Sequence, residues 1–190
     1  DNAAGSAVMM EALRLLKVSG LKMRRTVRLA LWTGEEQGLL GSRAYALQHF
    51  RDAQGNVLPE QKLVSGYFNV DNGSGAIRGV YLQGNDMVAP LFRQWMQPFH
   101  SYGMQTLTIN NTGGTDHLSF VADGIPGFQF IQDPLDYETR THHSSADTYE
   151  HVIPWDMERN AVIVAAFVYM TANRPEMLPR PPLPAAPRGR

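Results

Sequence analysis

The stretch Val27-Arg28-Leu29-Ala30-Leu31-Trp32-Thr33-Gly34-Glu35-Glu36-Gln37-Gly38-Leu39-Leu40-Gly41-Ser42 decides how the rest of the chain is interpreted. Its first six residues form a nearly continuous apolar run, which is typical of a buried strand. The run ends at a Thr-Gly pair, and two adjacent glutamates precede a segment with a helical pattern. Neighbouring carboxylates repel each other, and burial penalises both charges. A metal cation would compensate them, whereas an ordinary solvated Glu-Glu turn would need no cation.

The segments around this stretch predict an α/β protein. Helices are expected at residues 7–18, 39–50, 87–99 and 154–172, and strands at 24–32, 63–70, 79–82, 106–109 and 125–131. This alternation favours a three-layer sandwich: a mixed, mostly parallel sheet with helices on both faces. Ligands bind such sheets at the carboxyl ends of the strands. The acidic turns that follow Trp32 and Val70 both stand at such ends, and we therefore expect them to share a site.

Length and composition limit the kind of protein. The 190 residues suffice for one domain with a sizeable core, which we place at residues 1–177, followed by a proline-rich tail at 178–190. The net charge of −1 gives no electrostatic reason to expect nucleic acid as a partner. The longest strongly apolar run, residues 161–170, is too short to span a membrane. Because cysteine is absent, any metal site must use His, Asp or Glu.

Other polar positions could act together with the two glutamates, although each has an ordinary interpretation. Asp1 precedes a predicted helix and could cap it. Asp71 could be a common turn aspartate. The pair at residues 142–143 could be surface histidines, and the pair at residues 116–117 could be a second catalytic dyad or a capped turn. Their joint order along the chain is more informative than any one of them.

That order resembles the co-catalytic dizinc exopeptidases, which include the bacterial leucyl aminopeptidases and the plasma glutamate carboxypeptidase group. The matching motifs are Asp1-Asn2-Ala3-Ala4-Gly5, the double-glutamate segment at 32–42, Asp71, Gly114-Thr115-Asp116-His117 and His143-Ser144-Ser145-Ala146-Asp147-Thr148. The resemblance extends from Asp1 to about Met177, nearly the whole chain. Five motifs in the same order make it specific.

The resemblance implies a zinc-dependent exopeptidase that hydrolyses a terminal bond of a peptide substrate, with two zinc ions in the intact protein. Glu35 would be the general base, and His142 would donate to the developing oxyanion. The metal ligands that the resemblance implies are Asp1, Glu36, Asp71 and His143. It also implies a secreted or periplasmic location, although this sequence contains no signal peptide.

One departure from the family pattern concerns the amino-terminal side. The family has a His-x-Asp motif upstream of the aspartate that corresponds to Asp1, and this sequence does not contain it. We therefore expect an amino-terminally truncated fold, with one metal site complete (Asp1, Glu36 and His143) and the other limited to Asp1 and Asp71. We also expect a bare sheet edge, covered by an upstream segment or by a second copy in a homodimer.

Three other interpretations stay open at this point. A glutaminyl-cyclase-like acyl transferase would keep the fold and use a single zinc ion. A non-catalytic member would use the fold as a binding or dimerising ectodomain, although the intact Glu35–Glu36 pair argues against this. Finally, the chain could be a fragment that is inactive without its upstream residues.

Overall fold

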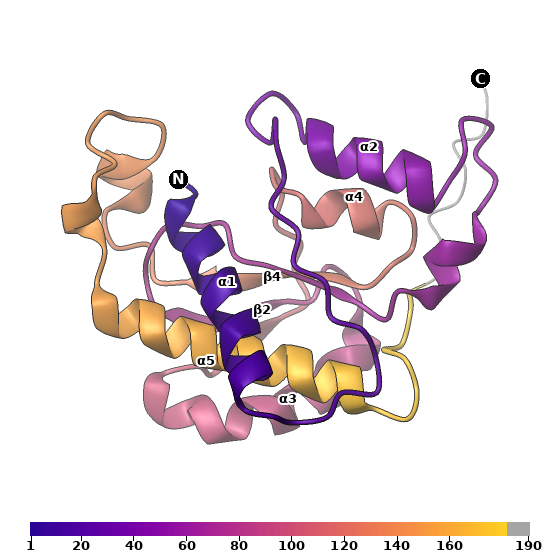
Figure 1. Ribbon diagram of the computed structural model, residues 1–190. Helices are drawn as coiled ribbons and strands as arrows, with labels where there is room; N and C mark the ends of the chain where they lie inside the picture. The colour runs from indigo at the N-terminus through magenta and orange to yellow at the C-terminus, as the bar shows by residue number, and fades with distance from the viewer. Residues whose placement is uncertain (182–190) are drawn as a thin grey trace.

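A four-stranded sheet crosses the middle of the protein (Figure 1). In this computed structural model, which describes residues 1–181, the strands are β1 (Tyr67–Asn69), β2 (Ile77–Tyr81), β3 (Thr106–Thr108) and β4 (Gly127–Gln132). Their order in the sheet is β1-β4-β2-β3. The pairs β1–β4 and β2–β3 are parallel, and β2–β4 is antiparallel. The prediction of a mixed, mostly parallel sheet is confirmed.

The helices lie between and beyond these strands in the chain. The α-helices are α1 (Ala3–Val18), α2 (Leu40–His49), α3 (Ala89–Met96), α4 (His117–Val121) and α5 (Pro154–Asn173). Short 3-10 segments are η1 (Pro59–Leu63), η2 (Asp86–Val88), η3 (Gln97–Tyr102) and η5 (Tyr149–His151), and η4 (Tyr137–Thr141) is a π-helical turn. Between Met87 and Phe99 the predicted continuous helix is therefore replaced by a 3-10 turn, α3 and the start of a second 3-10 turn, because Pro90 and Pro98 restrict the backbone there.

Side chains alternate across the sheet and separate two apolar layers, as expected for a strand whose successive residues face opposite sides. Phe68 packs into the larger cluster, which the helices α1, α3 and α5 cover, and its neighbour Tyr67 packs into the smaller one beside α2 and α4. Fully buried aromatic rings fill the larger cluster: Phe92, Phe128, Phe130 and Phe167. The expected three-layer arrangement, with helices on both faces, is confirmed (Figure 1).

The segment from Arg24 to Trp32 does not form the central strand that its apolar pattern predicts. It has no strand pairing, and residues 27–32 make no backbone–backbone hydrogen bond within the described part of the chain. β1 is an edge strand and pairs only with β4. An apolar run becomes a strand only where another strand lies close enough to exchange hydrogen bonds with it, and a cavity separates this run from the unpaired edge of β1. The sheet edge at β1 is therefore bare, as expected.

The carboxyl-terminal segment crosses the end of the domain before the described residues stop. Leu178 is buried in the larger apolar cluster, and its amide donates to Ser65 Oγ. The guanidinium of Arg180 donates to the carbonyls of Gln61 and Val64. The first residues of the predicted tail thus pack against the domain, while residues 182–190 lie outside the described part. Within residues 1–181, no helix is long and apolar enough to cross a bilayer.

Candidate metal centre

A tight turn presents Glu35 and Glu36 at the amino-terminal approach to α2. The carbonyl of Glu35 accepts hydrogen bonds from the amides of Gly38 and Leu39, at 2.9 and 2.8 Å. The turn starts at Gly34, whose φ of +64° is a left-handed conformation that glycine adopts without steric cost. Residues 34–39 thus form a tight turn, from which the side chains of Glu35 and Glu36 project.

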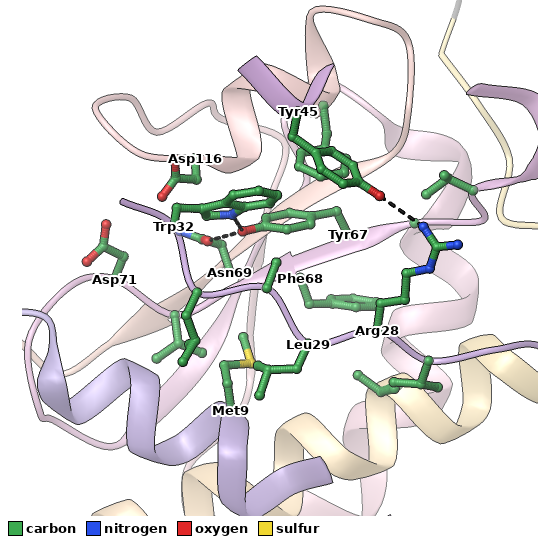
Figure 2. A pocket seen from close by; sticks show the side chains of 18 of the residues that line it. Met9, Arg28, Leu29, Trp32, Tyr45, Tyr67, Phe68, Asn69, Asp71 and Asp116 are labelled. Carbon is green, nitrogen blue, oxygen red and sulfur yellow. Dashed lines mark hydrogen bonds between the residues drawn. The ribbon is translucent and has the colours of Figure 1, made fainter. Parts of the chain in front are cut away.

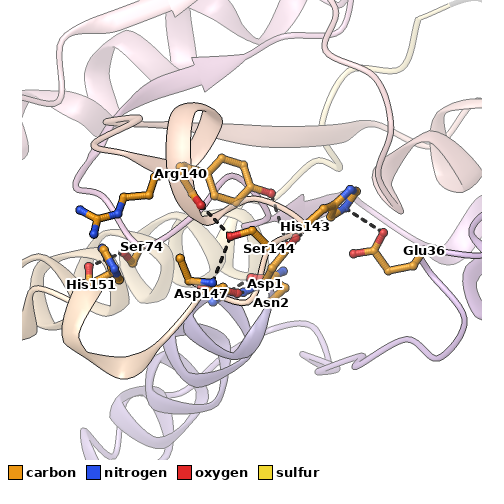
Figure 3. A network of polar contacts seen from close by, with 12 residues as sticks. Asp1, Asn2, Glu36, Ser74, Arg140, His143, Ser144, Asp147 and His151 are labelled. Atoms are coloured by element: carbon orange, nitrogen blue, oxygen red, sulfur yellow. Dashed lines mark hydrogen bonds and ion pairs between the residues drawn. The ribbon is translucent and has the colours of Figure 1, made fainter.

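Three of the four predicted metal ligands converge at His143. Its Nε2 atom lies 3.0 Å from Glu36 Oε2 and 3.6 Å from Asp1 Oδ2 (Figure 3). The imidazole is 58% exposed, whereas the side chain of Asp1, at the mouth of α1, is 13% exposed. His143 is more than 100 positions from both Asp1 and Glu36 in the sequence, so only the folded chain brings their donor atoms together.

Asp71, the fourth predicted ligand, follows β1 and is held from the protein side. The hydroxyl of Thr115 donates to Asp71 Oδ2 at 2.6 Å, and Asn69 Nδ2 donates to Thr115 Oγ1 at 2.8 Å. Burial raises the pKa of Asp71, and the negative charges of Asp116 and Glu36 raise it further. Asp71 therefore belongs to the same acidic cluster as Glu36, although the structure shows no direct contact between Asp71 and His143.

The environment of Glu35 favours its protonated form in the absence of a cation. Burial, together with the charges of Asp71, Asp116 and Glu36, raises the pKa of Glu35 to about 7. Burial also raises the pKa of Asp116, whose Oδ1 atom is buried without a hydrogen-bond partner. Figure 2 shows Asp71 and Asp116 close to Trp32 at one end of a pocket. Several crowded carboxylates of this kind need a cation for all of them to ionise.

This pocket is a large cavity of about 1640 Å³ between residues 25–32 and β1. The acidic residues form one end of it, and the aromatic side chains of Trp32, Tyr45, Tyr67 and Phe68 line its length (Figure 2). Its volume exceeds the usual range for a small-molecule site, about 300–1,000 Å³. The excess follows from the unpaired run 27–32, because part of the cavity is the space between that run and the sheet edge.

His142 lies beside the ligand set. Its ring centroid is 3.9 Å from that of His143 and 4.6 Å from that of Tyr137. One ligand atom each from Asp1, His142 and His143 lies within 4.8 Å of the others. The position agrees with a role in the site, and the assignment of His142 as a donor to the oxyanion stays a prediction.

The donor set fits zinc. Carboxylate oxygens and imidazole nitrogens are ordinary zinc ligands, and the convergence of Asp1, Glu36 and His143 supplies three of them. Burial and neighbouring carboxylates raise the pKa of Glu35 and of Asp71, so a bound cation would stabilise their ionised forms.

Several residues that support the site were not identified from the sequence. Besides Thr115, they are polar side chains of the strands: Asn69 donates to Gln129 Oε1 at 2.7 Å, and Gln129 Nε2 donates to Asn72 Oδ1 at 2.7 Å. Tyr137 is another, because its hydroxyl donates to Asp1 Oδ1 at 3.3 Å. Burial, together with the nearby carboxylates, raises the pKa of Tyr137, so its hydroxyl keeps the proton that it donates. For Asn69 and Gln129, the signal that could have indicated a role was an amide side chain inside an otherwise apolar strand.

The buried imidazole of His117 does not reach the acidic cluster and gives a prediction about stability. Burial lowers the pKa of His117 from 6.5 to about 4. The unfolded chain then binds a proton between these values that the folded protein does not, so the contribution of His117 to stability is complete above pH 6.5 and is lost as the pH decreases towards 4. This contribution is about 3 kcal/mol, and it is measured as the difference in pH dependence between the wild type and a variant without the imidazole, because the raised pKa values of Glu35, Asp71 and Asp116 act in the opposite direction.

Urea unfolding at a series of pH values tests this expectation. The variant His117→Gln should lose the corresponding part of the pH dependence, whatever its stability at neutral pH. His100→Gln, at an exposed position, is the matched control and should follow the wild-type curve. An unchanged pH dependence in His117→Gln would show that His117 already titrates normally in the folded protein.

Comparisons with known proteins agree with this geometry. The sequence profile of peptidase family M28 matches residues 1–168. Carboxypeptidase Q of Bos taurus is 32% identical over 180 residues, which are 95% of this chain and 36% of that protein. Leupeptin-inactivating enzyme 1 of Streptomyces exfoliatus is 26% identical over 189 residues, which cover 89% of this chain and 40% of that enzyme.

Solved structures give the same result. A peptidase M28 precursor from Shewanella amazonensis matches with a TM-score of 0.82 and 28% identity, over 96% of this chain and 39% of that one. BSAP, a zinc aminopeptidase from Bacillus subtilis, matches with a TM-score of 0.70 and 27% identity, over 92% of this chain and 42% of that one. The chain thus spans about two-fifths of the length of these relatives. The match over residues 1–168, together with the convergent carboxylates and histidine, establishes that the chain belongs to peptidase family M28.

Proposed function

We propose that this chain carries the catalytic residues of a zinc-dependent exopeptidase, which hydrolyses a terminal bond of peptides or dipeptides. One observation supports the proposal above all: His143 contacts both Asp1 and Glu36, next to a glutamate whose pKa lies near neutrality. Relatives named as a carboxypeptidase and as a zinc aminopeptidase agree with it. Which end of the peptide is cleaved depends on the substrate groups that the acidic cluster accepts.

The proposed division of labour gives each residue a separate task. Asp1, Glu36, Asp71 and His143 would hold zinc. The bound ions would polarise the scissile carbonyl and lower the pKa of a water. Glu35 would accept a proton from the attacking water as its oxygen bonds to the carbonyl carbon, and would return it to the amine as the C–N bond breaks. His142 would donate an N–H to the developing oxyanion.

A general base works best when its pKa is close to the working pH. Burial and the neighbouring carboxylates raise the pKa of Glu35 to about 7 without a metal, and a bound cation would lower it from there, so that Glu35 is ionised and ready to accept a proton. The apolar cavity next to the carboxylates offers room for the substrate side chain beside the cleaved bond. A free amino terminus would find a counter-charge in Asp71 or Asp116. We therefore expect an uncharged, apolar side chain to be accepted best.

Zinc titration of the purified protein, combined with a substrate panel, tests the proposed function. We expect zinc to bind with Asp1, Glu36 and His143 at about 2.0–2.2 Å in a crystal structure of the loaded protein. The panel contains dipeptides of which only the amino terminus or only the carboxyl terminus is free. It also contains a peptide blocked at both termini and a peptide with amino-terminal glutamine. Hydrolysis of the dipeptides alone is the expected result.

Each other outcome selects a different function. Cyclisation of the amino-terminal glutamine, with one zinc ion per chain, would favour the acyl-transferase interpretation. Zinc binding without turnover would favour a non-catalytic member of the family or a fragment that needs further residues of a longer polypeptide. Absence of zinc binding would contradict the proposal. A secreted or periplasmic location and a homodimer also stay predictions, which fractionation and light scattering can check.

A further inference from the structure

Tyr137 touches three segments of the candidate metal centre at once. It is the first residue of the π-helical turn η4, five positions before His142, and its side chain is buried, with 9% of the residue exposed. Its hydroxyl donates to Asp1 Oδ1 at 3.3 Å, across 136 residues of sequence. Its ring also packs on the imidazole of His142, with the planes inclined at 36°. The amino-terminal segment at Asp1 and the loop that carries His142 and His143 are thus joined through the side chain of Tyr137.

The third segment is the turn that follows Asp71. Gly73 lies directly on the tyrosine ring: a Cβ atom placed at Gly73 would come within 2.9 Å of Tyr137 Cγ. Gly73 also has a φ of +86°, so the turn both needs glycine for its backbone and uses the absence of a side chain to approach the ring. The position of the Asp71 turn is therefore defined by contact with the tyrosine.

This arrangement suggests what Tyr137 does. Groups that hydrogen-bond to a metal-ligating carboxylate fix its orientation, and their loss typically weakens metal binding 10–100-fold. His143 is 58% exposed and belongs to a loop. An ion pair at 2.6 Å between the amino group of Asp1 and Asp147 Oδ2 ties the backbone of Asp1 to this loop, whereas the hydroxyl of Tyr137 donates to the Asp1 carboxylate itself. A rigid ring that contacts all three segments would hold the donor atoms close to one another before the ion binds.

We propose that Tyr137 is a positioning residue of the zinc site, which orients Asp1 through its hydroxyl and sets the turn after Asp71 and the His142–His143 loop through its ring. The inference rests on the proposed function, because it needs zinc at this centre. It does not require Tyr137 to touch the substrate or the ion.

Zinc affinity of the Tyr137→Phe variant tests the role of the hydroxyl. The substitution keeps the ring and removes only the donor to Asp1. We expect zinc to bind at least tenfold more weakly, measured by competition with a chromophoric chelator, with an unchanged circular dichroism spectrum of the metal-free protein. Tyr149→Phe is the matched control, since Tyr149 is 82% exposed and its hydroxyl has no hydrogen-bond partner among the described residues. It should bind zinc like the wild type.

A second variant tests the ring without changing any polar group. Gly73→Ala should push the ring away and also weaken zinc binding at least tenfold. Gly20→Ala is its control: Gly20 has a similar φ of +67° with no neighbouring atom within 4 Å, so it carries the backbone strain alone. If Tyr137→Phe does not fold, the comparison of the two glycine variants decides the question.

The possible failures are distinguishable. Wild-type zinc affinity in folded Tyr137→Phe would overturn the positioning role and leave the proposed function intact. Equal zinc affinities in Gly73→Ala and Gly20→Ala would overturn the role of the ring. A wild-type protein that binds no zinc would instead contradict the proposed function itself, and the inference about Tyr137 with it.

Discussion

Replacing Glu35 with glutamine should lower turnover by about 10²–10⁴-fold while zinc stays bound, the usual range for a lost general acid–base group. The physical reason is that an amide cannot accept a proton from water, although it fills the same space. Steady-state kinetics on the best dipeptide, together with zinc analysis of the same active, zinc-loaded preparation, measure both quantities.

The neighbouring substitution is the matched control for this prediction. Glu36→Gln changes the same chemical group one residue along the turn, but Glu36 Oε2 contacts His143 Nε2 at 3.0 Å. This variant should lose zinc, and its activity should recover in part at high zinc concentration. If Glu35→Gln keeps its turnover, the role given to Glu35 is wrong. If both variants lose zinc equally, the proposed division of labour between the two glutamates is wrong.

Zinc should also raise the midpoint of thermal unfolding by roughly 10 °C at a free concentration about 1,000 times its dissociation constant. Ligand binding to the folded state alone contributes about 4 kcal/mol under this condition, and in a domain of this size 1 kcal/mol shifts the midpoint by about 2–4 °C. The cause is electrostatic: a cation compensates the crowded carboxylates of Glu35, Asp71 and Asp116. Scanning calorimetry of metal-free and zinc-loaded protein gives the shift.

His143→Ala distinguishes a specific zinc site from general cation binding by acidic groups. The imidazole contacts both Asp1 and Glu36, so its removal should abolish most of the shift. Magnesium at the same concentration should have little effect on the wild type, because it prefers oxygen ligands in octahedral geometry. A shift of the same size in His143→Ala would mean that zinc stabilises the protein elsewhere.

The sequence by itself determined the fold class and the family. Strands and helices alternate along the chain, and local patterns of apolar residues and turn residues suffice to predict that order. Motifs such as Thr33-Gly34-Glu35-Glu36 are contiguous, so they can be identified without knowing where the chain goes. The same local character explains why the end of α1 and both bounds of α5 lie close to the predicted ones, although α1 starts at Ala3, four residues before its predicted start.

Tertiary structure alone decided features that depend on distant partners. The run at 27–32 has the composition of a strand, yet it has no ladder, because strand formation requires a neighbouring strand as well as an apolar sequence. Local pattern likewise gave no indication of the contacts of Tyr137, since a tyrosine in a polar loop is unremarkable until Asp1 and Gly73 are brought against it.

The electrostatics of the site also required the fold. In the sequence, Glu35 has one acidic neighbour, whereas in the structure Asp71 and Asp116 add their charges and burial removes water. The chemical types of the donors were therefore readable from the residues, while their convergence and their pKa values were not. Ionisation depends on burial and on nearby charges, and Asp71 and Asp116, which lie 36 and 81 positions after Glu35 in the sequence, come near it only once their segments have packed together.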